Sequence, residues 1–164
     1  MSTTYPLIRD NFKTVIHAIT PATHSRQAKF RIHTEAVEFV AWVEANAKAC
    51  WRRFELLNAV NYEHEGLTNA GGSDSLWQFT HDMALLVAYP REFGKFGAEN
   101  ERDLDDAIDA DLAQIDKAIG GDGSASSNWV SGLDDCRRVA VAATKTAQAV
   151  IVSCTYRLLY DRSY

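Results

Sequence analysis

The amino-acid sequence predicts a single α+β domain: an antiparallel β-sheet of about four to five strands, covered by amphipathic α-helices in a two-layer arrangement. Two patterns support this fold class. Apolar and polar residues alternate from Trp77 to Tyr89, as in a strand with one buried face. Apolar residues from Leu104 to Ile119 step by four, four, three and four positions, as on one side of a helix. The 164 residues fit one core, and no linker divides residues 1–164 into separate domains.

The first third of the chain predicts two helices with a short extended segment between them. In residues 5–19, Ile8 and Phe12 fall at helical spacing with other apolar residues, and Pro21 follows where the helix should end. Phe30 and Ile32 alternate with polar neighbours, which is typical of either a short strand or an extended arm. Residues 34–49 predict a second helix that Thr34 caps. We expect its apolar side to consist of Val37, Val40, Ala41 and Ala45.

A hairpin is predicted next. The apolar period changes to two after Arg52, so that Phe54, Leu56, Val60 and Tyr62 share one face of a strand. The linking segment GLTNAGGSDS, residues 66–75, is rich in turn formers. Because the alternating segment 77–89 follows directly, the simplest arrangement of the two strands is an antiparallel hairpin.

The remaining residues predict a helix followed by a second pair of strands. Asn100 is the expected cap of an acidic helix that ends at Gly120. Val139, Val141 and Ala143 then alternate with smaller or polar residues, and KTAQ, residues 145–148, forms the expected turn. A final strand alternates from position 150 to position 160, close to the end of the chain.

The charge is concentrated in one segment. The net charge is −5, and residues 100–119 alone carry −5, so the rest of the chain balances at fifteen acids and fifteen bases. Since a dedicated nucleic-acid binder should have a basic excess, this class of function is not favoured. No apolar run has the length of a membrane span and the N-terminus does not resemble a signal peptide, so we expect the protein in a cytoplasm.

The residue types that usually carry chemistry do not form a recognisable motif. Cys50, Cys136 and Cys154 are widely spaced, which favours buried thiols over metal ligands. His64 and His81 could approach each other across the predicted hairpin, but His81 falls on the apolar face, where a hydrogen-bonded core histidine is commoner than a ligand. The glycine-rich segments lack the lysine and the strand-to-helix context of a phosphate-binding loop. We therefore expect no catalytic residues, no metal and no cofactor.

Two charged segments are candidate functional surfaces. The basic stretch around Arg26, Lys29 and Arg31 has no acid between Asp10 and Glu35, and it could contact DNA phosphates or an acidic neighbouring subunit. The acidic helix could meet a basic partner or repel DNA. For both segments, an ordinary solvated surface is the alternative. The glycine-rich loops 66–75 and 120–128 are natural candidates for ordering on a partner.

In the order of its elements, the chain resembles the tail terminator proteins of long-tailed, siphovirus-like phages. The shared elements are an N-terminal helix, a glycine-rich hairpin, an acidic amphipathic helix and a closing C-terminal hairpin. The segment ITPATHSRQAKFRIHTEAVEFVAWVEANAKACWRRFELLN is similar to the opening of such proteins, and AVIVSCTYRLLYDRSY is similar to their ending.

This resemblance implies a virion structural protein rather than an enzyme. Its members form a hexameric ring on the head-proximal end of the tail tube, meet the head completion or neck proteins, and let genomic DNA pass through the lumen without sequence-specific binding. The protein would then be assembled in the host cytoplasm and reside in the tail or neck of the virion. Under this hypothesis, Asp105, Asp109 and Asp116 are the candidate acidic lumen or interface surface.

Two alternatives stay open from the sequence. One is another ring of the neck or head–tail connector, such as a stopper or a tail completion protein. The other belongs to a different class: a small α+β enzyme or ligand-binding module, in which His81 and Tyr89 would line a pocket between sheet and helices.

Overall fold

The computed structural model of the chain describes residues 4–23, 29–57, 62–68, 76–91, 101–119, 130 and 133–163. The helices are α1 (Tyr5–Ala18), α2 (Phe39–Ala45), the short 3-10 helix η1 (Ala47–Ala49) and α3 (Glu101–Ile119). The strands are β1 (Arg31–Ile32), β2 (Arg53–Leu57), β3 (Tyr62–Thr68), β4 (Leu76–Pro90), β5 (Leu133–Lys145) and β6 (Ala149–Ser163). The α+β class predicted from the sequence is confirmed.

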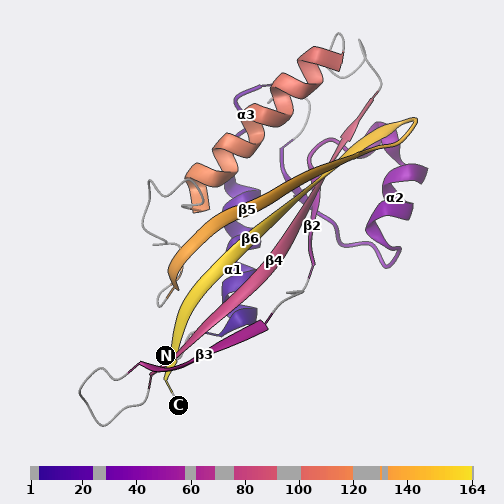
Figure 1. Ribbon diagram of the computed structural model, residues 1–164. Coiled ribbons are helices and arrows are strands. Elements are labelled where there is room, and N and C mark those ends of the chain that lie inside the picture. The colour runs from indigo at the N-terminus through magenta and orange to yellow at the C-terminus, as the bar shows by residue number, and fades with distance from the viewer. Residues whose placement is uncertain are drawn as a thin grey trace.

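The described strands form one six-stranded sheet with β4 and β6 at its centre (Figure 1). Its order is β1-β2-β4-β6-β5, and β3 pairs with the other half of β4. All pairs are antiparallel except β1 with β2, so the two-residue β1 makes the predicted antiparallel sheet a mixed one. The predicted C-terminal hairpin is present, since β5 pairs with β6. The first predicted hairpin is correct only in part: its first strand is two strands, β2 and β3, which both pair with β4, and β3 extends to Thr68 in the predicted link 66–75, of which residues 69–75 lie outside the described part.

The main core lies between one face of this sheet and the helices α1 and α3. The side chains of Phe79, Met83, Leu85, Val87 and Tyr89 on β4 are all buried there, as the alternation of the sequence predicts. Helix α1 contributes Ile8, Phe12 and Ile16 to the same cluster, close to its predicted bounds of 5–19. The Nδ1 atom of His17 lies 2.8 Å from the carbonyl oxygen of Phe30, which ties α1 to the segment before β1.

The predicted helix over residues 34–49 is wrong in its bounds and in its buried side. Helix α2 begins only at Phe39, because the side chain of Glu38 accepts hydrogen bonds from the backbone N–H groups of Val40 and Ala41 and so caps the helix. Val37 and Val40, expected inside, are 54% and 37% exposed. The buried residues are Phe39 and Val43 instead.

Helix α2 also packs on the second face of the sheet, away from α1 and α3. Phe39 and Val43 form a smaller apolar cluster with Cys50, Ala88 and Ile151. The predicted two layers therefore describe the main core, while α2 adds a third layer at one end of the sheet (Figure 1). At this end of the sheet, β4 and β6 have apolar side chains on both faces, so helices can pack on both of them.

A buried ion pair joins α3 to the sheet. The side chain of Arg52 is completely buried, and its guanidinium group donates to both carboxylate oxygens of Asp111, with 3.1 Å between Nη2 and Oδ1. The same nitrogen donates to the carbonyl oxygen of Thr23 at 2.6 Å, and the Tyr89 hydroxyl donates to Asp111 Oδ2 at 3.0 Å. The guanidinium also lies over the ring of Trp51, 5.4 Å from its centroid. These bonds compensate for taking both charges out of water.

Arg52 reaches this position through an uncommon backbone conformation. Its φ of 52° lies in the left-handed region, which costs a non-glycine residue of the order of 1–3 kcal/mol. The backbone N–H donates to the carbonyl oxygen of Ala88 at 2.9 Å, and the backbone carbonyl accepts from the N–H of Arg31 at 3.0 Å. Both backbone groups are thus satisfied by strands on either side, and together with the ion pair they hold the turn in this conformation.

The three cysteines are buried free thiols, as the sequence predicts. Burial raises the pKa of Cys50 and of Cys136 to about 12, and that of Cys154 to about 11. At neutral pH they therefore pack as small apolar groups. Among the described helices, none is long and apolar enough to span a membrane.

Replacing Asp111 by alanine should strongly destabilise the fold, because it leaves the Arg52 cation buried without its partner. We expect a loss of about 3–5 kcal/mol in the free energy of unfolding, measured by urea denaturation. Asp109→Ala is the matched control, since Asp109 is an exposed acid on the same helix, and its effect should stay within about 0.5 kcal/mol. Equal effects of the two substitutions would contradict this assignment.

Candidate assembly surface

The outer edge of the sheet at β5 carries exposed apolar residues. From Val139 to Lys145 the strand is exposed on both of its faces, and Val139 and Val141 are 42% and 49% exposed. The strand pairs with β6 only, and no other described strand lies along its outer edge. A long edge with apolar side chains and unpaired backbone groups is a surface that natural proteins usually cover.

Helix α3 lies beside this edge and forms a groove with it. The helix supplies Asp105, Ile108, Asp109 and Leu112; the strands supply Val141, Ala143 and Lys145 from β5 and Val150 and Val152 from β6. The floor is thus apolar, while two exposed carboxylates stand along the helix side. The 3.6-residue period of α3 explains this, because the row that buries Leu104, Ile108 and Leu112 is flanked directly by acids.

One end of the groove is closed by an ion pair. The Nζ of Lys145 donates to Oε1 of Glu101 at 3.0 Å, and Arg91 approaches the same carboxylate at 3.7 Å. The hydrogen bond from Lys145 is the main cause that lowers the pKa of Glu101, and Glu101 in turn raises the pKa of Lys145. The Lys145 charge is therefore largely matched, which leaves Asp105 and Asp109 as the net negative charge of the groove.

Asp116, the third acid proposed for a lumen or interface, lies inside the fold. Its residue is only 7% exposed; it accepts from the Tyr156 hydroxyl at 3.0 Å and pairs with Arg138 at 3.1 Å. Its helical position, four residues after the buried Leu112, turns it toward the sheet. Asp116 is therefore not part of the exposed lumen or interface surface for which the sequence made it a candidate. Asp105 and Asp109 are exposed, as a lumen or interface role requires.

The basic residues lie at the opposite edge of the sheet. Lys29 and Arg31 are exposed in and beside β1, and Phe30 between them is buried. Arg26 lies outside the described residues. Strands β2, β4 and β6 separate β1 from β5, so within one chain the structure does not bring these cations to the acids of α3.

Among the described histidines, His81 is the one that the sequence singles out, and it lies in the core. His81 is 5% exposed; its Nδ1 lies 3.0 Å from the Tyr160 hydroxyl and its ring meets Tyr5 edge-on. Burial lowers the pKa of His81, so a neutral core histidine describes it. The neighbouring Asp82 points to the other face, where it forms a bidentate pair with Arg157. Side-chain positions at His64 lie outside the described part, and no described His, Cys, Asp or Glu residues form a group of three suited to a metal.

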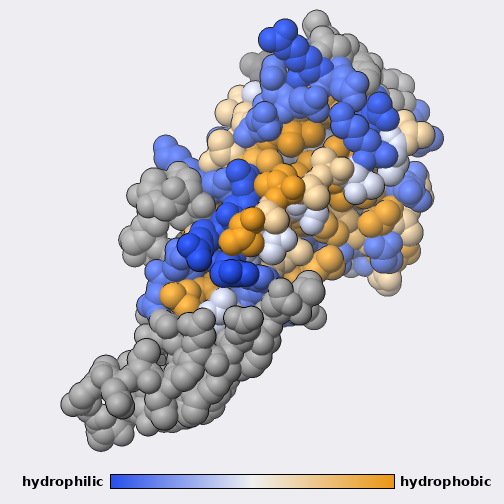
Figure 2. All heavy atoms as spheres, in the orientation of Figure 1, coloured by the Kyte–Doolittle hydropathy of each residue, from blue (hydrophilic) through white to orange (hydrophobic). Residues whose placement is uncertain are grey.

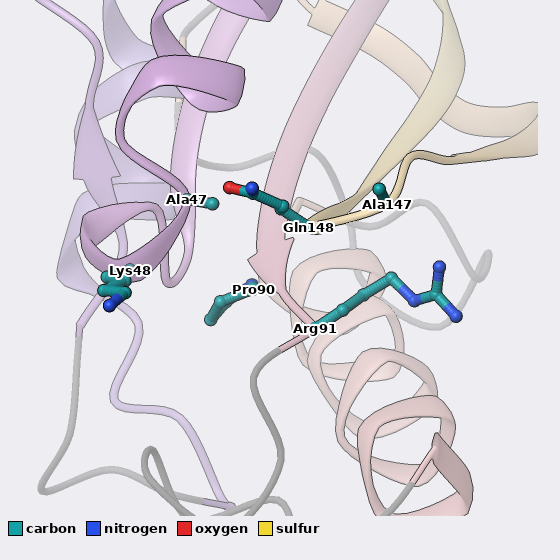
Figure 3. A pocket seen from close by; sticks show the side chains of 6 residues that line it. All are labelled: Ala47, Lys48, Pro90, Arg91, Ala147 and Gln148. Carbon is teal, nitrogen blue, oxygen red and sulfur yellow. The ribbon is translucent and has the colours of Figure 1, made fainter.

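If the protein were a small enzyme or ligand-binding module, His81 and Tyr89 should line a pocket between sheet and helices, but other side chains pack against both. Tyr89 is fully buried and its hydroxyl is used by Asp111, and His81 is enclosed by aromatic rings. A separate hollow lies at the end of β4, lined by Ala47, Lys48, Pro90, Arg91, Ala147 and Gln148. Figure 3 shows the charged ends of Lys48 and Arg91 on opposite sides, pointing away from each other. Arg91 donates to the carbonyl oxygen of Thr146 at 2.7 Å, so this hollow does not converge charges on a ligand.

Apart from α2, no described helix covers the face of the sheet opposite α1. Its β5 residues Ala140 and Ala142 are exposed and small, and Leu57 on β2 is 41% exposed. Figure 2 shows apolar residues gathered across the middle of this view, with hydrophilic ones above them and to their left. The exposed part of β5 is therefore weakly polar on both sides, unlike the ordinary solvated strand in which one face is charged.

The sequence indicates the acidic helix and the strands but not the groove between them. The alternation of Val139, Val141 and Ala143 predicts a half-buried strand, yet these residues are all exposed. The available signal was the small size of the intervening residues: Ala140, Ala142 and Thr144 provide no charged outer face.

No protein-family model matches the chain, and no curated protein is significantly similar to it.

The buried acids Asp111 and Asp116 each accept a hydrogen bond from a buried tyrosine. These tyrosines make the free energy of unfolding depend on pH, and their ionisation can be measured. Burial raises the pKa of Tyr89 and of Tyr156, and the nearby carboxylates of Asp111 and Asp116 raise it further. Since a tyrosine in the unfolded chain ionises near pH 10, this contribution to the free energy of unfolding is fully present below about pH 10 and is lost as the pH rises above it.

We therefore expect the ultraviolet absorbance of phenolate to show that Tyr89 and Tyr156 ionise only as the chain unfolds. Tyr156→Phe should remove one tyrosine from this late group, and Tyr89 should still ionise only as the chain unfolds. Ionisation of every tyrosine while the native circular dichroism persists would contradict the buried networks.

Proposed function

We propose that the protein is a structural component of a phage virion, a tail terminator that forms a ring, most simply a hexamer, on the head-proximal end of the tail tube. Its partners would be further copies of itself, the tail tube protein and a head completion or neck protein. The observation that carries this proposal is the β5 edge, an apolar surface beside an acidic helix with no cover in the described chain. The resemblance in element order supplies the particular assembly.

The groove suits association of proteins better than catalysis. Its polar groups are two carboxylates standing apart on one helix and an amine paired with Glu101. A closed cyclic assembly can bury such an edge on every copy, because one repeated contact serves all neighbours. Burial of the edge would also remove the hazard of open-ended strand pairing.

The charge of the chain is compatible with DNA passing through the ring. A net charge of −5 supplies no excess of cations for phosphates, so DNA would slide without being held. This would place the protein in the virion tail or neck after assembly in the host cytoplasm.

Light scattering of the purified chain, alone and with its tail tube protein, tests the proposal. We expect a ring of about six copies, or one that forms only on the tube. A ring that ignores the tube but binds a head connector would favour another ring of the neck. A chain that stays monomeric alone and with the tube protein would contradict an assembly function and favour a ligand-binding one.

A charge placed on the β5 edge should prevent the ring from forming. Val141→Lys puts an ammonium group in the groove, where assembly would have to desolvate it. Val37→Lys is the matched control, because Val37 is similarly exposed, at 54% against 49%, and lies outside the groove. Unchanged ring mass for Val141→Lys, with normal folding, would show that assembly does not use this edge.

A further inference from the structure

We infer that the copies of this chain join head to tail through opposite edges of the sheet, with Lys29 and Arg31 at the β1 edge of one copy seated on Asp105 and Asp109 beside the β5 edge of the next. The inference deepens the proposed function and rests on it for the existence of a ring. What it adds is the pair of surfaces and the residues that recognise each other.

The two edges are opposite in position and in charge. The sheet order places β1 at one end and β5 at the other, so one chain cannot close this contact on itself. The acidic edge has Asp105 and Asp109 exposed along the groove. The basic edge has Lys29 and Arg31 exposed, and among the described residues no ion pair engages either of them.

The spacing of the charges also fits. Two residues apart on an extended chain, Lys29 and Arg31 project to one side about 6.6 Å apart, with Phe30 turned into the core. Asp105 and Asp109 are four residues apart on α3, which corresponds to a rise of about 6 Å along one side of the helix. Each cation can therefore meet one carboxylate at the same time.

A second feature favours two different surfaces over a symmetric contact of one surface with itself. Two copies of the acidic groove would bring four carboxylates together, and two basic edges would bring four cations together. Like charges at an interface are unfavourable, whereas the groove against the basic edge pairs every charge. A contact between different surfaces repeats from copy to copy and closes into a ring when the rotation allows it.

The apolar floor of the groove gives this contact something to bury besides charge. Val141 on β5 is half exposed, and Ile32, next to Arg31, is partly buried at the edge of the core. Pairing of charges on the rim with apolar contact at the centre is the usual arrangement of a protein interface.

Two variants with complementary charge reversals test the inference on the full chain. The first, K29E/R31E, makes the β1 edge acidic, and the second, D105K/D109K, makes the groove basic. Each variant alone would oppose like charges in every contact, so we expect its assembly, followed by analytical ultracentrifugation, to be weakened about tenfold or more. The exposed positions should leave the circular dichroism spectrum and the thermal midpoint unchanged.

Mixing the two variants should restore assembly. The acidic edge of the first then meets the basic groove of the second, and the native basic edge of the second meets the native acidic groove of the first. The fourfold variant K29E/R31E/D105K/D109K should assemble alone for the same reason. The control D10K/E44K carries the same charge change as D105K/D109K on two exposed acids of α1 and α2, and it should assemble like the native chain.

The outcomes separate this inference from the proposed function. If the native chain forms rings and neither reversal weakens them, the inferred contact is wrong while the ring stands. If D105K/D109K forms rings of normal mass that retain DNA in assembled particles, these acids line the lumen and the inference is overturned. If the native chain remains monomeric with the tube protein, both proposals fail together.

Discussion

The position of α3 depends on one buried ion pair, and the groove depends on the position of α3. Arg52 reaches from the turn before β2 through the core to Asp111, and Tyr89 on β4 adds its hydroxyl to the same carboxylate. Five residues further along α3, Asp116 makes similar contacts: it accepts from the Tyr156 hydroxyl on β6 and pairs with Arg138 on β5. Because carboxylates buried this way are strongly oriented by their donors, these two anchors fix the rotation of the helix about its axis. The same rotation turns Asp105 and Asp109 outward beside β5.

Polar anchors of this kind favour a defined orientation over maximal stability. A helix held only by Leu104, Ile108, Leu112 and Ile115 could rotate or slide with modest changes in buried area, since dispersion and burial have little directionality. Paired charges in the core cost desolvation, and replacing them with apolar residues is often neutral or stabilising in other proteins. Their presence here is consistent with a surface whose geometry matters, because a repeated contact tolerates little error in angle if it is to close.

The sequence predicts most helices and strands well, but it does not predict the hydrogen bonds and ion pairs that join them. A strong hydrophobic period, such as that of β4 or α3, predicts its element reliably because the fold has to bury the whole apolar face. The segment 34–49 failed because a single capping side chain, Glu38, and the apolar pair Phe39 and Val43 override a weaker pattern. Asp111 and Asp116 look like members of an exposed acidic row; their burial follows from Arg52, Tyr89, Tyr156 and Arg138, which lie far away in the sequence. Only the fold brings such donors together.

The exposed β5 edge is best explained together with the β1 edge at the other end of the sheet. A monomer would normally protect such an edge with inward charges, proline or a covering segment, and Val139 to Thr144 contain no charge at all. If both edges were acidic, copies would repel; if both were neutral and apolar, they would stack without selecting an angle. Here the charges of α3 and β1 are opposite in sign and similar in spacing, so the edge would accept one kind of neighbour in one orientation. Specificity of this type comes as much from the mismatched contacts that it rejects as from the one that it allows.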